Sequence, residues 1–212
     1  MRRPLSGSGI WLGSLFVCVV AVGLAFPLVD VPVARAVYPL SGSLSALGAG
    51  LGSAVLLMLE AVVVLTLVLV RLVRGHISPF GEALAIACLS SICAYAIDSN
   101  VLKICFGVPN PASVMQGAQH SFNFWKGSQS SSFPSGHMVL AGAFCGVFMR
   151  LYRSAIWPLA ALLCVAALLL ILGNWHFVSD VIAGTFIGVS AGLLAGELWR
   201  AHFRRDGRTD WT

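Results

Sequence analysis

The sequence predicts an all-α, polytopic membrane protein: a six-transmembrane-helix bundle with an extracytoplasmic cap loop, formed as a single domain over residues 1–212. Hydrophobic residues make up 58% of the chain and charged residues only 10%, which is too little polar surface to cover a soluble globule. Six apolar runs of about 20 residues, the length that crosses a membrane, are separated by polar breaks. The cationic residues lie in these breaks and form no continuous basic face, which argues against a nucleic-acid partner.

The first predicted span covers residues 10–29 and follows the basic start of the chain. Its length favours a retained span, although Ala34-Arg35-Ala36 offers the alternative of a cleaved signal segment. Residues 30–50, which contain proline, glycine and serine, are predicted to connect the spans on the outer side and to lie partly on the membrane surface. No function is predicted for this connector.

The second and third spans each carry an acidic residue. Glu60 interrupts the span 51–70 and is either a functional carboxylate or a carboxyl group that is hydrogen-bonded to a nearby serine or threonine. Asp98 lies near the outer end of the span 83–102, just before Lys103. The two could pair, although residues five apart do not face each other on an α-helix.

Residues 103–133, which we call the cap loop, form the longest polar stretch of the chain. A loop of this length between spans is usually functional or disordered, so we expect it to cover an active site. The last three spans are predicted at residues 134–152, 155–173 and 178–199. Glycines four residues apart in the last span predict a close-packing helix face: Gly184, Gly188, Gly192 and Gly196.

The basic residues are divided unequally between the two sides of the predicted bundle. Ten fall on one side: Arg2, Arg3, Arg71, Arg74, Arg150, Arg153, Arg200, Arg204, Arg205 and Arg208. Three fall on the other: Arg35, Lys103 and Lys126. Because basic loops stay in the cytoplasm, both termini are predicted to be cytoplasmic and the cap loop extracytoplasmic.

Two short motifs on the outer side carry the chemistry. In Pro134-Ser135-Gly136-His137, two small residues precede a helix, so backbone N–H groups at its positive end can hold a phosphate beside His137. His176 and Asp180 are four residues apart and share one face of the helix that opens the last span. The carboxylate can fix the tautomer of the imidazole and raise its basicity.

These motifs resemble those of the type 2 phosphatidic acid phosphatase superfamily, which also includes bacterial acid phosphatases and vanadium haloperoxidases. The family pattern is K-x6-R-P, then P-S-G-H, then S-R-x5-H-x3-D. The second block is complete at residues 134–137, and the third keeps His176 and Asp180. The first block keeps Lys103 and Pro111. The motif-bearing core covers about residues 98–199.

Both arginines of the family pattern are replaced. Asn110 stands at the position of the first, and Leu170, after Leu169 in place of the motif serine, stands at the position of the second. Because a transferring phosphoryl group carries negative charge, other donors are needed. We predict that Lys126 folds over the phosphate and that Asn110 and Asn174 supply neutral donors. Alternatively, Lys126 is a solvated charge or contacts anionic lipid head groups.

The resemblance implies that His176 is the nucleophile and forms a phosphohistidine, with Asp180 bonded to its other nitrogen. His137 would protonate the leaving group and then activate water. The phosphate oxygens would be held by Lys103, Ser135 and Gly136. The implied activity is metal-independent hydrolysis of a membrane-lipid phosphate ester or diphosphate, phosphatidate-like or polyprenyl, at the outer face of the plasma (inner) membrane.

Two other functions are compatible with the same residues. A lipid-linked phosphotransferase would use the same His-His-Asp set and pass the phosphoryl group to another alcohol, and a non-catalytic relative would only bind or transport lipid. No His, Cys, Asp and Glu cluster has metal-ligand spacing, and no glycine-rich nucleotide loop is present. We therefore predict no metal and no cofactor, and as partners only the bilayer and a lipid phosphate substrate.

Overall fold

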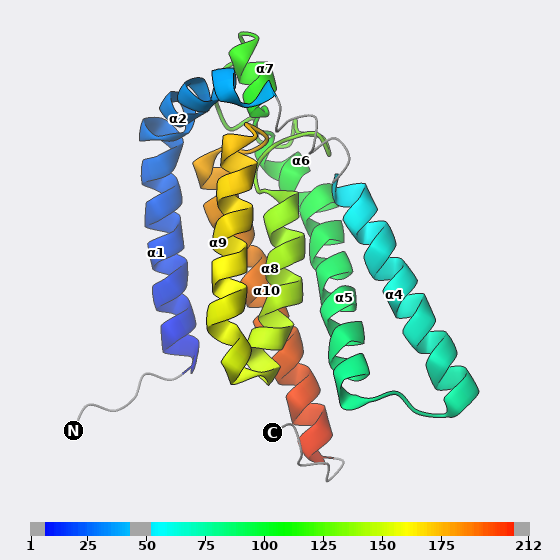
Figure 1. Cartoon of the computed structure of the whole chain (residues 1–212). Coiled ribbons are helices and arrows are strands. Elements are labelled where there is room, and N and C mark those ends of the chain that lie inside the picture. The colour runs from blue at the N-terminus through cyan, green and yellow to red at the C-terminus, as the bar shows by residue number, and fades with distance from the viewer. Residues whose placement is uncertain (1–6, 43–51, 206–212) are drawn as a thin grey trace, which may run out of the picture.

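The structure is a computed structural model that describes residues 7–42 and 52–205. Within these ranges every regular element is a helix, which confirms the all-α prediction. The long helices are α1 (Gly7–Leu28), α4 (Ser53–Arg74), α5 (Pro79–Ile97), α8 (Gly136–Leu151), α9 (Ile156–Leu172) and α10 (Val178–Arg205). They run side by side, and the start of α1 lies at the same end of the bundle as the end of α10 (Figure 1).

Five helices in the described part of the chain are long and apolar enough to cross a membrane, so the protein is a multi-pass membrane protein. The prediction of six spans is not confirmed, because α8 has only 16 residues. At 1.5 Å per residue it is about 24 Å long, shorter than the hydrocarbon layer of about 30 Å. Most of its residues are buried among α5, α9 and α10, so α8 need not match the bilayer.

Helices α8 and α10 pack closely through glycine. A Cβ atom on Gly184 would lie 2.5 Å from the carbonyl oxygen of Ser135, and one on Gly188 would lie 2.5 Å from that of Val139. Any larger residue would push the two backbones apart, which confirms the predicted packing face. Since both helices begin at the same end, this contact sets the first turn of α10 beside the first turn of α8.

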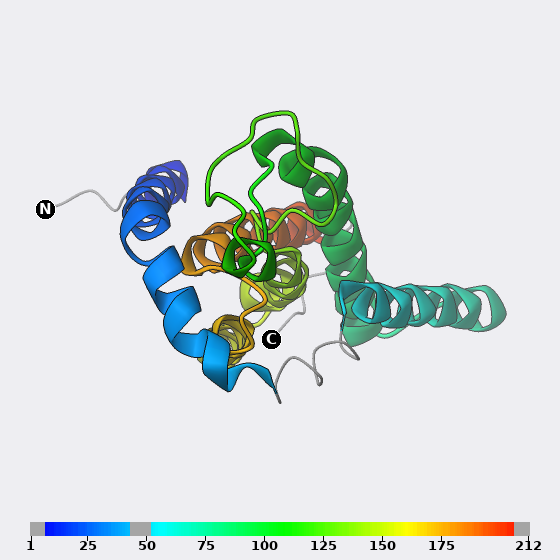
Figure 2. The same cartoon turned by 90° about the horizontal axis from the view of Figure 1, so that it is seen from above.

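The end of the bundle where α8 and α10 begin is covered by short elements. A π-helical turn (Asp98–Leu102) continues α5 into α6 (Lys103–Phe106), which is followed by α7 (Pro111–Met115). From the end of α1, α2 (Asp30–Val37) turns across the bundle and a 3₁₀ turn follows at Tyr38–Leu40. Seen from above, α7 lies over the ends of α8 and α10, and α2 curves around the side (Figure 2).

Helix α4 leans away from the other helices (Figure 2) and packs mainly on α5. Across this contact the Ser91 hydroxyl donates a hydrogen bond of 2.8 Å to the Glu60 carboxyl. This is the hydrogen-bonded arrangement that the sequence left as one of two possibilities for Glu60. The bond ties α4 to α5 at mid-span and lies away from the outer end of the bundle.

Candidate active site

The two predicted histidines meet at the end of the bundle where α8 and α10 begin. His137 is the second residue of α8, and His176 lies in the short connection before α10. Their ring centroids are 5.7 Å apart, and the ring planes are inclined by 69°. Both side chains line a cavity of about 450 Å³. The close packing of α8 on α10 therefore brings together two residues that are far apart in the sequence.

Asp180 lies beside the His176 ring, on the side of Nδ1. Its side chain is fully buried, and Oδ2 lies 3.5 Å from Nδ1 of His176. The same oxygen accepts a 2.8 Å hydrogen bond from the backbone N–H of Phe177, which fixes the carboxylate in place. With Nδ1 turned toward Asp180, Nε2 is the ring nitrogen that is available to a ligand in the cavity.

Lys103 supplies a buried cation to the same cavity. Its Nζ donates a 2.6 Å hydrogen bond to the carbonyl oxygen of Ser131, which leaves two N–H donors for other partners. In a π-helical turn, residues five apart are bonded neighbours, so the turn at Asp98–Leu102 allows the pairing that an α-helix would disfavour.

Ser135 and Gly136 form the start of α8, as predicted for the phosphate cradle. The Ser135 hydroxyl is buried and has no hydrogen-bond partner, and no side chain caps the helix. A Cβ atom on Gly136 would lie 2.8 Å from the Tyr95 ring and 3.2 Å from Oδ2 of Asp98. Glycine is therefore required for the close approach of α8 to α5. Both residues are buried behind the side chains that line the cavity.

Two asparagines and a leucine lie at or near the two positions where the family pattern has arginine. Asn110 and Asn174, which were predicted to supply neutral donors, both line the cavity. Asn110 uses its side-chain oxygen to cap α7, which leaves its NH₂ group as a donor. Asn174 has a left-handed backbone (φ 54°) and a buried oxygen with no partner. Leu170 packs in an apolar cluster with Met138, so no polar side chain takes the place of the second arginine.

The sequence predicted that Lys126 folds over the phosphate cradle, but the structure places it elsewhere. It lines a neighbouring pocket of about 300 Å³ in the cap loop and is not among the residues that line the cavity with the histidines. The two hollows share part of their walls, at Asn110, Ser130 and Ser131.

Asp30 is a buried residue of this region that the sequence did not predict. It opens α2, is 1% exposed, and accepts two hydrogen bonds from Ser179 in the first turn of α10. The backbone N–H of Ser179 donates to Oδ1 at 2.9 Å, and its hydroxyl donates to Oδ2 at 2.5 Å. Asp30 therefore caps the start of α10. This helix also carries Asp180, the residue that follows Ser179 in the chain. The contact joins residues 149 positions apart, so no local pattern could reveal it.

His120 in the cap loop completes this second polar cluster. Its Nε2 lies 3.5 Å from Oδ2 of Asp30, and its ring packs between Phe26 of α1 and Phe177, with centroids 4.1 and 4.4 Å away. Burial raises the pKa of Asp30 to about 6, although the bonds from Ser179 oppose the shift. Burial also lowers the pKa of His120. The cluster ties α1, α2 and the cap loop to the start of α10.

Two histidines and a buried lysine thus line one cavity in a multi-pass helical bundle, and the carboxylate of Asp180 lies beside one of the histidines. The family model for the PAP2 superfamily matches residues 83–204, more than half of the chain, and the protein belongs to this superfamily of phosphatase-type enzymes. A search of curated proteins and a search of solved structures each found no match. The family match begins within α5, so Asp30 lies outside it.

Proposed function

We propose that the protein hydrolyses a phosphate ester or diphosphate of a membrane lipid through a phosphohistidine formed on His176. The observation that carries the proposal is the pairing of His176 with the buried carboxylate of Asp180 in the cavity that His137 and Lys103 also line. A neutral imidazole oriented by a carboxylate is a competent nucleophile. The superfamily, which consists of phosphatase-type enzymes, supports the same reaction class.

In the first step, Nε2 of His176 attacks phosphorus and a P–N bond forms. The bond between phosphorus and the lipid oxygen breaks, and the electron pair stays on that oxygen. The protonated ring of His137 gives the oxygen a proton, which is the role of a general acid. The lipid leaves as an alcohol or, from a diphosphate, as a lipid monophosphate.

In the second step, a water molecule attacks the phosphohistidine. His137, now neutral, takes a proton from this water, and the P–N bond breaks with its electron pair returning to Nε2 of His176. Inorganic phosphate leaves, and both histidines regain their starting protonation. Asp180 stabilises the charge that develops on the His176 ring in both steps.

The non-bridging oxygens need donors that are in place before the reaction. We propose the two remaining N–H donors of Lys103 for this role, because Lys103 lines the cavity. The Ser135 hydroxyl and the Gly136 N–H are the further donors that the family resemblance implies, but both residues are buried and neither lines the cavity. The NH₂ groups of Asn110 and Asn174 add neutral donors at the cavity wall. Neutral donors and one lysine give weaker charge compensation than two arginines, because bonds from charged donors are roughly twice as strong.

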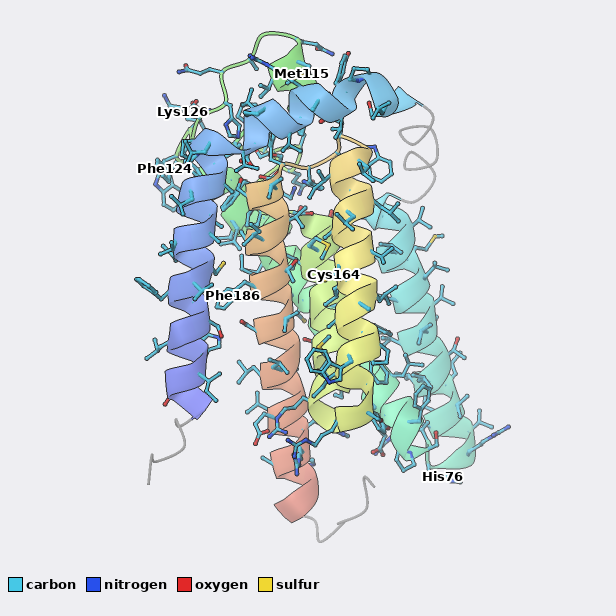
Figure 3. The ribbon with its side chains drawn as sticks, turned by 60° about the vertical axis from the view of Figure 1, so that its left-hand side comes forward. His76, Met115, Phe124, Lys126, Cys164 and Phe186 are labelled. Atoms are coloured by element: carbon cyan, nitrogen blue, oxygen red, sulfur yellow. The ribbon has the colours of Figure 1, made fainter. Side chains whose placement is uncertain are left out.

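The ten-to-three division of basic residues supports an outer active site, with both termini in the cytoplasm of a cell whose inner membrane holds the protein. Lys126 and His76, which lies two residues after Arg74, are at opposite ends of the bundle (Figure 3). A substrate with its tail in the outer leaflet and its phosphate in water suits a cavity at that end.

The test is phosphate release by the purified protein in detergent micelles of lipid phosphate, with and without an added alcohol. We expect inorganic phosphate in both cases, and His137→Ala should abolish most of it. His76→Ala, a histidine at the opposite end of the bundle, is the matched control and should keep the wild-type rate. Phosphate found only on the added alcohol would indicate a phosphotransferase. Neither release nor transfer from any lipid phosphate would indicate a non-catalytic lipid binder.

A further inference from the structure

A second pocket opens in the cap loop directly beside the catalytic cavity. Its volume is about 300 Å³, against about 450 Å³ for the cavity with the histidines. Asn110, Ser130 and Ser131 belong to the walls of both, whereas Lys126 and Ser128 belong to the second pocket alone. We call it the cap pocket. A ligand group in the catalytic cavity would therefore have its neighbouring group within reach of the cap pocket.

The backbone of the cap loop holds this pocket open before any ligand binds. The N–H of Gly127 donates a 3.1 Å hydrogen bond to the carbonyl oxygen of Ile104, so the loop is fastened along α6. Gly107 has a left-handed backbone (φ 59°), and a Cβ atom there would overlap the carbonyl oxygen of Asn123. Glycine at this crossing lets the two backbones touch, and the crossing fixes the position of Lys126 at the pocket wall.

The charges of the cap pocket suit an anion. Lys126 is exposed, and none of the described residues that line the pocket is acidic. The hydroxyls of Ser128 and Ser130 are hydrogen-bonded to each other at 2.7 Å, and the NH₂ group of Asn110 is a donor shared with the catalytic cavity. Each hollow thus has one lysine, Lys103 in the cavity and Lys126 in the cap pocket.

The cap pocket also lies where a lipid would approach. Phe124, two residues before Lys126, is 57% exposed, and its ring stacks on Phe122, which stacks on Phe26 near the outer end of α1. Trp125 is 75% exposed. Aromatic side chains at the end of a span favour the head-group level of the membrane. Phe124 and Lys126 lie together at this side of the bundle (Figure 3), so Lys126 is placed near the aromatic side chains that would meet the lipid head groups.

We propose that the cap pocket is a second anion subsite, which holds the lipid-linked phosphate of a lipid diphosphate while the terminal phosphate lies in the catalytic cavity. This proposal rests on the proposed function. Nε2 of His176 attacks the terminal phosphorus, the bond to the bridging oxygen breaks, and its electron pair stays on the lipid monophosphate. Lys126 compensates the charge that builds up on that leaving phosphate. Hydrolysis of the phosphohistidine then releases inorganic phosphate.

This assignment also accounts for the loss of the two arginines. A phosphate is a better leaving group than an alkoxide, because its conjugate acid is much stronger, so its departure needs less help from the site. A cation beside the leaving phosphate, in addition to Lys103 at the reacting one, would bind the second charged group of such a substrate. A lipid monophosphate would leave the cap pocket without a partner for Lys126.

The test compares farnesyl diphosphate with farnesyl monophosphate in detergent micelles, since the two share one chain. We expect the wild type to prefer the diphosphate in kcat/KM, and Lys126→Gln to lower that preference by about tenfold or more, the cost of one charge-assisted bond. Lys126→Arg should restore most of the preference. Gln129→Ala, in the same loop but outside the cap pocket, is the matched control and should leave the ratio unchanged.

Two results would overturn the subsite. An unchanged substrate ratio in Lys126→Gln would remove Lys126 from the binding of a second phosphate. Equal losses on both substrates would place it at the reacting phosphate or in a structural role. Failure of the proposed function is recognised separately: the wild type would then release no phosphate from either substrate, or His176→Ala would release it as fast as the wild type.

Discussion

Replacing Asp30 by alanine tests whether the segment outside the family match positions the catalytic helix. The Asp30 carboxylate accepts both the N–H and the hydroxyl of Ser179, which is fully buried. Alanine would leave these two donors unsatisfied. Each buried unsatisfied group costs about 1–3 kcal/mol, so the variant should lose about 2–6 kcal/mol unless the helix moves. Any movement would carry Asp180 and His176 with it.

The expected effect is on turnover more than on binding. A misplacement of about 1 Å near the chemistry can cost about 10²-fold, so Asp30→Ala should lower kcat by about 10- to 100-fold with a much smaller change in KM. Asp30→Asn should restore most of the rate, because its amide can accept from the Ser179 N–H and donate to the Ser179 hydroxyl. Arg35→Gln, an exposed residue of the same helix, is the control.

The pH dependence of stability gives an independent test of the contribution of Asp30 to the fold. Burial raises the pKa of Asp30 from 3.8 to about 6, so between these values the folded protein binds more protons than the unfolded chain. The contribution of Asp30 to stability is therefore greatest below pH 4 and is lost as the pH rises through 6. Melting of the wild type in detergent should show this decline relative to Asp30→Asn. A wild-type kcat and melting temperature in Asp30→Ala would refute the positioning role.

Three further predictions concern the nucleophile's partner, the topology and the metal independence. Asp180→Asn should lower kcat by about 10²- to 10⁴-fold with little change in KM, and a wild-type rate would exclude an orienting role for this carboxylate. A reporter fused after Thr212 should be cytoplasmic and one inserted near Gln119 external, whereas the inverse result would move the active site to the cytoplasmic side. EDTA should leave the rate unchanged, and strong inhibition would contradict a metal-independent mechanism.

The parts of the site that depend on local spacing could be predicted from the sequence. The proximity of His176 and Asp180 could be predicted from their spacing of four residues, although His176 lies just before α10 and not on its face as the sequence predicted. Ser135-Gly136 lies at the start of a helix because small residues lead into an apolar run. The meeting of His137 with His176 followed from the order of the motifs and the number of spans between them. The glycines at intervals of four predicted a close-packing face on the last span, and the structure identifies α8 as the helix that packs on it.

The parts that depend on distant contacts could not be predicted. Asp30 looked like the first polar residue after a span, and its partner Ser179 lies 149 positions away. The expectation for Asp98 and Lys103 assumed an α-helix, whereas a π-helical turn changes which residues are neighbours. The position of Lys126 is set by a backbone crossing at Gly107, which has no signature in composition or periodicity. An apolar run also does not reveal that its helix, α8, is short and surrounded by protein.

The central claim is that His176 becomes covalently phosphorylated, and trapping the intermediate tests it most directly. The purified protein would be mixed with lipid diphosphate labelled at the terminal phosphate, quenched within milliseconds in denaturant at alkaline pH, and digested for mass spectrometry. The account predicts an acid-labile phosphoryl group on His176 in the wild type and its absence in His176→Ala. A catalytically active wild type with no phosphorylated peptide, or with the label on another residue, would contradict the account.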